Sequence, residues 1–149
     1  MSTSPTDRPA DRPADDAFGV LMREVMAGAD RFGHRQHVEL AWRAVRAHGT
    51  AAAVELVGAG IDRTATAAGA PQKFHVTMTR AWVELVGLRL AADGEEGAAD
   101  GFDGFAARHP ELFEAALLHR HYRPETLAAD TARISWVEPD LAPLSATAQ

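Results

Sequence analysis

Apolar residues recur along most of the chain at intervals of three and four, the spacing that places them on one face of an α-helix. The stripe is clearest in residues 15–29, through Phe18, Leu21 and Val25, and in residues 51–68. No segment alternates between apolar and polar residues over a useful length, as a half-buried β-strand would. The pattern therefore predicts an all-α fold in which amphipathic helices pack into a bundle.

Residues that favour helix ends divide this pattern into segments. Five longer helices are predicted, over residues 15–29, 33–48, 51–68, 72–92 and 110–121. Gly49 suits the end of the second helix, and Pro110 suits the first turn of the fifth. The remaining predictions are a loop over residues 93–100, a short sixth helix over residues 124–132 and an extended segment over residues 134–137. The result is a single-domain bundle of about five to six helices.

Both ends of the chain differ in composition from the middle. The sequence Asp-Arg-Pro-Ala occurs twice in tandem within residues 7–14, and such a segment has little apolar surface to bury. We expect residues 1–14 and 145–149 to be disordered tails and residues 15–144 to form the helical domain. The chain of 149 residues has the length of one ordinary domain.

Charge and composition narrow the classes of partner. The net charge is −6, the only lysine is Lys73, and the arginines are scattered, so the chain lacks the basic face of a nucleic-acid-binding protein. No apolar run approaches the ~20 residues that span a membrane, and the first residues lack the apolar core of a signal peptide. The absence of cysteine excludes disulfides and thiolate metal ligands. We expect a cytoplasmic protein that acts on a small molecule, without a nucleic-acid or membrane partner; a homodimer stays open.

Three histidines give the strongest indication of a functional site. His34 and His37 lie three apart, which places their Cβ atoms roughly 5–6 Å from each other on one helix face. That face continues through Ala41 and Val45, so it is directed toward the core. His75 is expected at the start of the helix over residues 72–92, on another inward face. Three imidazoles suit a transition metal and leave positions open for water or substrate.

The other histidines favour a structural interpretation, and the same interpretation stays open for the first three, as hydrogen-bonded core or helix-end residues. His48 falls at a predicted helix C-terminus, where an imidazolium suits the helix dipole. His109 precedes a proline in a predicted loop. His119 and His121 are two apart and diverge on a helix, so each is only an additional candidate ligand.

Several short motifs occur in a fixed order within residues 32–144. They are Phe32-Gly-His34-Arg-Gln-His37 with Ala41-Trp42, then Phe74-His75-Val-Thr77, Tyr122, Pro124-Glu125-Thr-Leu127, Ala132-Arg133 and Pro139-Asp140. Their order and spacing resemble a group of small bacterial helical proteins that read F-x-H-x-x-H-x-x-x-A-W and, further on, aromatic-His-x-Thr. Many of those proteins have Glu where this chain has Val76, so no acid or base is expected there. The resemblance implies a shared site at the three histidines and no particular reaction.

The first hypothesis is a metal-dependent enzyme of the oxidoreductase or lyase type that acts on a small molecule. One transition-metal ion would be held by His34, His37 and His75. Copper or zinc is favoured over iron, because iron oxygenase sites usually include a carboxylate ligand.

Three further residues are candidates for contact with the substrate. Arg80 or Arg133 would pair with a substrate carboxylate, and Tyr122 would donate a proton or orient the substrate. Two alternatives stay open: a non-enzymatic protein that binds a metal or a small ligand in the same pocket, and a metal-free interaction protein whose histidines only pack.

Overall fold

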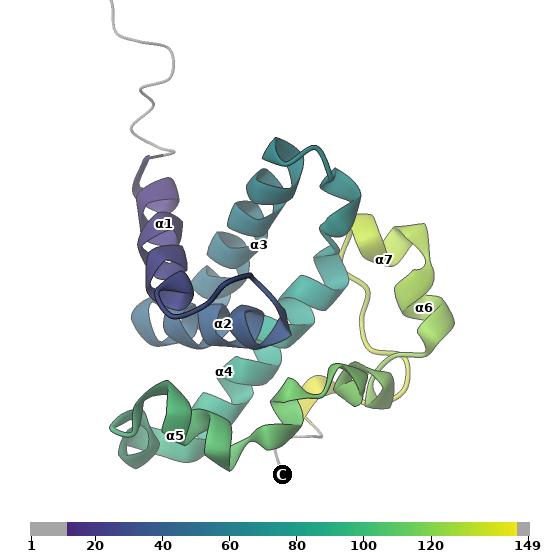
Figure 1. The fold of residues 1–149 in the computed structure, drawn as a ribbon. Helices are drawn as coiled ribbons and strands as arrows, with labels where there is room; N and C mark the ends of the chain where they lie inside the picture. Colours follow the sequence, from purple (N-terminus) through teal and green to yellow (C-terminus); the bar gives the residue numbers. More distant parts are fainter. Residues whose placement is uncertain (1–11, 146–149) are drawn as a thin grey trace, which may run out of the picture.

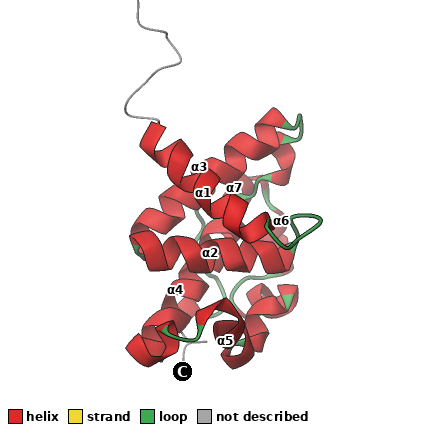
Figure 2. Cartoon of the chain, turned by 60° about the vertical axis from the view of Figure 1, so that its left-hand side comes forward, coloured by secondary structure: helices red, strands yellow, loops and turns green. Residues whose placement is uncertain are grey.

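The computed structural model describes residues 12–145, and the side chains of all of these except residues 12–16 and 96–98. This part of the chain is mostly helical, with short connections and without a β-strand, which confirms the all-α prediction (Figure 2). Tails were predicted over residues 1–14 and 145–149, and residues 1–11 and 146–149 of them lie outside the described residues. Residues 12–14 belong to the first helix, so the prediction of disorder is wrong there. No helix in the described part is long and apolar enough to cross a membrane.

Figure 1 shows the helices, labelled and coloured in the order in which they occur along the chain. The longer helices are α1 (Arg12–Met26), α2 (His34–His48), α3 (Thr50–Ala67), α4 (Val76–Ala98) and α5 (Gly101–Arg108). Short α-helices α6 (Pro124–Ala128) and α7 (Asp130–Ile134) and the 3₁₀ turns η1 (Pro71–Lys73), η2 (Pro110–Phe113) and η3 (Ala115–Arg120) complete the set. The first three predicted helices are confirmed, apart from shifts at their ends.

Helices α2, α3 and α4 pack against one another and form the centre of the bundle. Their facing stripes are fully buried, with Val38 and Ala41 of α2, Val57 of α3, and Val83 and Val86 of α4 at 0% exposure. Helix α1 packs on α2 and α3, and the chain from η2 to α7 lies along the side of α4 (Figure 1). Burial of these apolar stripes is the main force that holds the bundle together.

The predicted helix over residues 72–92 begins later and ends later in the structure. Residues 71–73 form η1, and α4 starts at Val76, directly after His75, so the predicted start at residue 72 is wrong. The predicted loop over residues 93–100 is also wrong, because α4 continues to Ala98 past a break at Gly94, where φ is 68°. Glycine adopts this left-handed conformation at little cost, which lets the helix bend there and continue.

Helix α5 was not predicted, although the sequence carries a signal for it. Phe102 and Phe105 are three apart and both pack against Trp42, with ring centroids 5.5 and 6.4 Å from the indole. That spacing is typical of one helix face. Asp93, which precedes the break in α4, is held to the end of α5 by hydrogen bonds from Arg108 and His109.

The C-terminal third is less regular than its periodicity indicates. Residues 110–121 form two 3₁₀ turns instead of one α-helix, separated at Glu114, whose backbone is extended. Residues 124–134 form α6 and α7 with a break at Ala129, instead of one helix. Residues 135–137 are extended but pair with no strand; Thr77 donates a hydrogen bond to the Ser135 carbonyl and accepts one from the Val137 N–H. Long-range polar contacts therefore order this segment.

Candidate functional site

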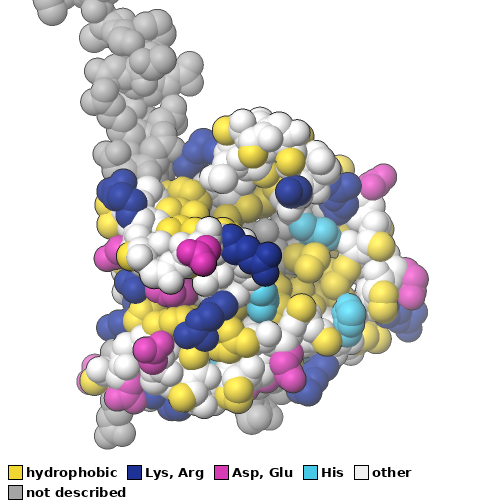
Figure 3. Space-filling model, in the orientation of Figure 1, with side chains coloured by type: hydrophobic (Ala, Val, Ile, Leu, Met, Phe, Trp, Pro, Cys, Tyr) yellow, Lys and Arg dark blue, Asp and Glu magenta, His cyan; other side chains and the backbone are white. Residues whose placement is uncertain are grey.

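A cavity of about 650 Å³ opens between α2, α3 and the start of α4, and all three predicted site histidines line it. Its lining is largely apolar and contains no Asp or Glu. The lining residues are Met22, Phe32, Gly33, His34, His37, Ile61, Thr64, Ala65, Ala68, Ala70, Lys73, His75, Met78, Thr79 and Trp82. Figure 3 shows histidine side chains among apolar ones on this face of the molecule, with basic side chains beside them. A cavity of this size and polarity is typical of small-molecule sites.

His34 is the first residue of α2, and its ring is fixed by two contacts. Its Nε2 lies 2.9 Å from the Leu112 carbonyl oxygen, which can only accept a hydrogen bond, so Nε2 is the protonated nitrogen. The ring stands edge-on to Trp82, with centroids 4.6 Å apart. His34 therefore ties the 3₁₀ turn η2 to the bundle, and its lone pair is on Nδ1.

His75 is the residue before α4, and both of its ring nitrogens are engaged. Nδ1 accepts a hydrogen bond from the Met78 N–H at 3.1 Å, and Nε2 donates one to the Leu127 carbonyl at 2.8 Å. The Thr79 N–H donates to the backbone carbonyl of His75, which places His75 at the helix N-cap. The side chain thus caps α4 and holds α6 against its start.

His37 differs from the other two histidines. Its Nε2 is buried and has no hydrogen-bonding partner among the described residues. Burial lowers the pKa of His37 from 6.5 to about 4, and the nearby His34 adds to the effect. The imidazole is therefore neutral at pH 7, with one N–H and one lone pair. A buried polar atom without a partner is uncommon and costs free energy, so it marks His37 as the unusual residue of the cavity.

The three imidazoles share a cavity, but their nitrogens do not form a metal centre in the conformation seen. Among the described residues, no group of three or more His, Asp or Glu side chains is placed to hold a metal ion. His75 has no free lone pair, since its two nitrogens are committed to Met78 and Leu127. The donor set present therefore does not fit a three-histidine ion, and that centre stays a prediction.

The structure does not place Arg80, Arg133 or Tyr122 in the lining of this cavity. Arg133 donates a hydrogen bond to the Gln72 carbonyl and so holds α7 against η1. The guanidinium of Arg80 pairs with Glu84 and lies 4.1 Å from the ring centre of Trp136. The substrate-binding role predicted for the two arginines has no support at the histidine cavity.

Tyr122 is fully buried, and its hydroxyl donates a hydrogen bond to the Val137 carbonyl at 2.7 Å. Burial raises the pKa of Tyr122 well above its usual range, and the charge of Glu138 raises it further. A hydroxyl that is both engaged and hard to ionise is a poor proton donor in catalysis. Its observed role is to fix residues 135–137.

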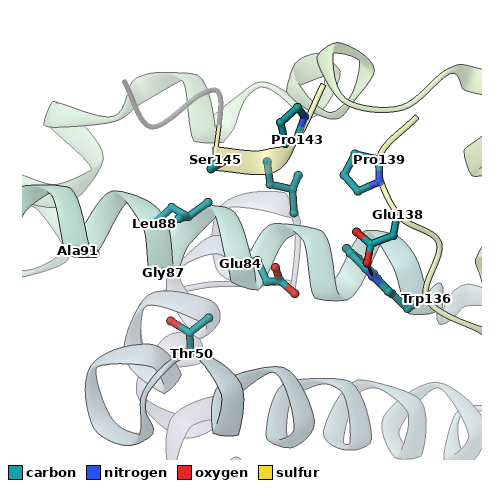
Figure 4. A pocket seen from close by; sticks show the side chains of 11 residues that line it. Thr50, Glu84, Gly87, Leu88, Ala91, Trp136, Glu138, Pro139, Pro143 and Ser145 are labelled. Carbon is teal, nitrogen blue, oxygen red and sulfur yellow. Dashed lines mark hydrogen bonds between the residues drawn. The ribbon is translucent and has the colours of Figure 1, made fainter. Parts of the chain in front are cut away.

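A second cavity, of about 490 Å³, lies further along α4 (Figure 4). Trp136, Glu138 and the two prolines Pro139 and Pro143 form one side of it, and Glu84 and Gly87 of α4 form the other. The indole N–H of Trp136 donates to Glu138 at 3.0 Å. Glu84 is neutralised by Arg80. Trp136, Glu138 and Glu84 therefore have polar partners, in contrast to the Nε2 of His37.

The C-terminal motif Pro139-Asp140 has a structural role. The carboxylate of Asp140 accepts hydrogen bonds from the Arg123 N–H at 3.0 Å and from the Thr126 hydroxyl at 2.5 Å. These bonds, that of Thr126 first, hold the pKa of Asp140 below its ordinary value. Arg123 is the N-cap of α6, so Asp140 caps that helix from a distance.

Sequence reasoning missed one charged residue of the cavity. Lys73, in η1, lines the cavity and is the only Lys or Arg of the described residues that does so. The described residues include no carboxylate that pairs with it, and its side chain is exposed. The sequence could have indicated this residue, because Lys73 is the only lysine in the sequence and lies two residues before His75.

Comparison of the chain with protein-family models, with curated proteins and with solved structures finds no match. The resemblance drawn from the short motifs therefore stays a prediction, and the fold and the cavity are the features from which a function can be argued.

Proposed function

We propose that this chain binds a small, largely apolar organic molecule in the histidine cavity, with His37 as its hydrogen-bonding partner. The observation that carries the proposal is the buried Nε2 of His37, which has no partner among the described residues and belongs to a ring that lines the cavity. The ring lines the cavity while its Nε2 is closed to solvent, so a ligand reaches this nitrogen when the ring turns toward the cavity. The hydrogen bond completed in this way would recover the free energy lost on burying the nitrogen.

The remaining lining supports the same function. Met22, Ile61, Met78 and Trp82 provide apolar surface for a ligand body, and methionine side chains adapt to ligands of different shape. His34 and His75 are held by hydrogen bonds to backbone carbonyls, so this wall is formed before a ligand arrives. A preformed apolar cavity with few polar groups is the usual form of a small-molecule site.

The neutral state of His37 defines what it can do for a ligand. With a pKa of about 4, its imidazole accepts or donates one hydrogen bond at pH 7 and carries no charge. A general base works best when its pKa is near the working pH, so this imidazole is better suited to binding than to proton abstraction. We therefore favour binding over acid–base catalysis.

The cavity itself can be tested with three probes that share one ring and differ in charge: benzyl alcohol, phenylacetate and benzylamine. Methionine methyl groups labelled with ¹³C report the site, because Met22 and Met78 line the cavity whereas Met26 packs against the core elsewhere. We expect at least one probe to shift the Met22 and Met78 signals in a saturable way, with Met26 unchanged. If no probe does so, or if Met26 responds equally, the proposal is overturned.

A blocking variant makes the test specific to the cavity. Ala65→Phe places a ring in the cavity wall, whereas Ala67→Phe places the same ring on the exposed side of the same helix. Both variants retain the helix, since either position is at its surface. We expect Ala65→Phe to abolish the methyl shifts and Ala67→Phe to preserve them; equal binding by both would also overturn the proposal.

A metal-dependent enzyme is the second candidate, because three histidines line one cavity and neutral imidazole is the form that binds metals. Against it stand the two engaged nitrogens of His75. Elemental analysis of the purified protein tests it: an equimolar transition metal that is lost in His37→Phe would favour this candidate over the first.

A further inference from the structure

The charges around the cavity are unbalanced in one direction. Of the residues whose side chains are described, its lining contains Lys73 and no Asp or Glu, in a chain whose net charge is −6. The three lining histidines cannot reverse the sign, since an imidazole side chain is either neutral or positive. An uncompensated ammonium at the mouth of an otherwise uncharged cavity favours a negatively charged guest.

The N-termini of two helices also make the electrostatic potential in the cavity more positive. Gly33, His34 and His37 place the first turn of α2 at the cavity, and Met78 and Thr79 place the first turn of α4 there. The N-terminal end of a helix carries a partial positive charge. At α4 the Met78 N–H is already bonded to His75 Nδ1, so this helix end contributes through its partial charge and not through that N–H. Both helices are long enough for this effect, with 15 and 23 residues.

One helix C-terminus also lies at the cavity, and its carbonyl groups are already satisfied. Helix α3 ends at Ala67, and Thr64, Ala65 and Ala68 line the cavity. The carbonyls of Thr64, Ala65 and Thr66 accept hydrogen bonds from the N–H groups of residues 68, 70 and 69. Because these carbonyls are already hydrogen-bonded, the negative end of α3 repels an anion in the cavity less strongly.

We infer that the ligand of this cavity is a small carboxylate with an apolar body, with its anionic end at Lys73 and the first turn of α4. The inference rests on the proposed function. Lys73 lies three residues before α4 in the sequence and lines the same cavity as Met78 and Thr79 of its first turn, so an anionic group at Lys73 would lie near that end of the helix. The apolar body then extends along Met78 and Trp82 toward His37.

The three probes test the charge preference directly, because they differ only in the group at the end of one methylene. We expect phenylacetate to bind about five- to thirty-fold more tightly than benzyl alcohol, from one exposed ion pair and two helix ends, and benzylamine to bind most weakly. Raising the ionic strength to 1 M should reduce the preference, since exposed charges are screened. Benzylamine binding as tightly as phenylacetate would overturn the inference.

Substitution of Lys73 tests whether its ammonium group causes the preference for a carboxylate. Lys73→Met keeps the length of the side chain and removes its charge, and Arg120→Met removes the same charge at an exposed position outside the cavity. We expect Lys73→Met to weaken phenylacetate binding at least about three-fold without changing benzyl alcohol binding, and Arg120→Met to change neither. An unchanged phenylacetate affinity in Lys73→Met would overturn the inference.

The two proposals fail in different ways. If none of the three probes binds, the cavity is not a ligand site, and this inference falls with the proposed function. If the probes bind with equal affinity, or if the amine is preferred, the ligand-binding function stands and only the carboxylate is wrong.

Discussion

The Nδ1 atom of His75 accepts a hydrogen bond from the backbone N–H of Met78, 3.1 Å away. Through this bond a histidine takes the N-cap role that Ser, Thr, Asp or Asn usually fill. Its other nitrogen reaches the Leu127 carbonyl, 52 residues further along the chain. One side chain therefore starts α4 and anchors α6 beside it.

Substitution of His75 should accordingly lower stability. His75→Ala removes both hydrogen bonds and should reduce the free energy of unfolding by about 1–3 kcal/mol. His75→Asn restores an acceptor for the Met78 N–H and should recover about 1 kcal/mol of that loss. Urea unfolding at pH 7 measures both. Equal stability of His75→Ala and the unaltered protein would show that the two bonds contribute nothing.

Replacement of glycine by alanine should have opposite effects on stability at two positions of α3. A Cβ on Gly60 would come within 2.2 Å of the Phe18 ring, whereas a Cβ on Gly58 would meet nothing within 4 Å. Gly58→Ala should therefore stabilise the protein by about 0.5–1 kcal/mol through helix propensity. Gly60→Ala should destabilise it by about 1–3 kcal/mol, because α1 must shift. Thermal unfolding of the pair checks the packing of α1 on α3, and a gain of stability in Gly60→Ala would refute that packing.

Tyr122 should contribute to stability and not to ligand binding. Tyr122→Phe removes the hydrogen bond to the Val137 carbonyl and should cost about 0.5–1.5 kcal/mol. Phenylacetate affinity should be unchanged, because Tyr122 is outside the cavity lining. Calorimetric titration and unfolding of the variant measure the two quantities. A large loss of affinity with unchanged stability would restore the proton-donor role predicted from the sequence.

His37 should make stability depend on pH in a definite direction. In the folded protein His37 stays neutral down to about pH 4, whereas in the unfolded chain it takes up a proton near pH 6.5. Unfolding is therefore accompanied by proton uptake between these values, so stability falls as the pH falls from about 6.5 to 4. The loss attributable to this residue is at most about 3 kcal/mol, at about 1.4 kcal/mol per pKa unit.

His37→Phe isolates that contribution. The variant keeps a ring of similar shape and lacks the titrating group, so its advantage over the unaltered protein should grow as the pH falls through this range. At pH 7 it should be as stable or more stable, since it removes a buried nitrogen without a partner. A difference in unfolding free energy that is constant from pH 7 to pH 4 would contradict the lowered pKa.

Local pattern was enough to predict the bundle and the histidines that line its cavity. The stripes of α1, α2 and α3 are long and regular, and the spacing of His34 and His37 placed both on the inward side of α2. These features depend on neighbours within one or two helical turns, which a sequence displays directly.

The features that the sequence could not predict depend on hydrogen-bonding partners that are distant along the chain. The role of His75 depends on the Leu127 carbonyl, and that of Tyr122 depends on the Val137 carbonyl. Arg133 likewise bonds to the Gln72 carbonyl. Backbone carbonyls carry no sequence signature, so polar residues that bind them resemble catalytic residues in the sequence. Of the three predicted site histidines, His37 alone has a buried nitrogen without a partner among the described residues.

The most direct test of the ligand site follows the ring nitrogens of the histidines by ¹⁵N NMR while phenylacetate is added to saturation. His121 is an internal control, because its Nε2 is also buried without a partner among the described residues but lies outside the histidine cavity. The account predicts that the His37 nitrogens shift on binding while those of His121 do not. Unchanged His37 nitrogens at saturation, or equal shifts at both residues, would contradict it.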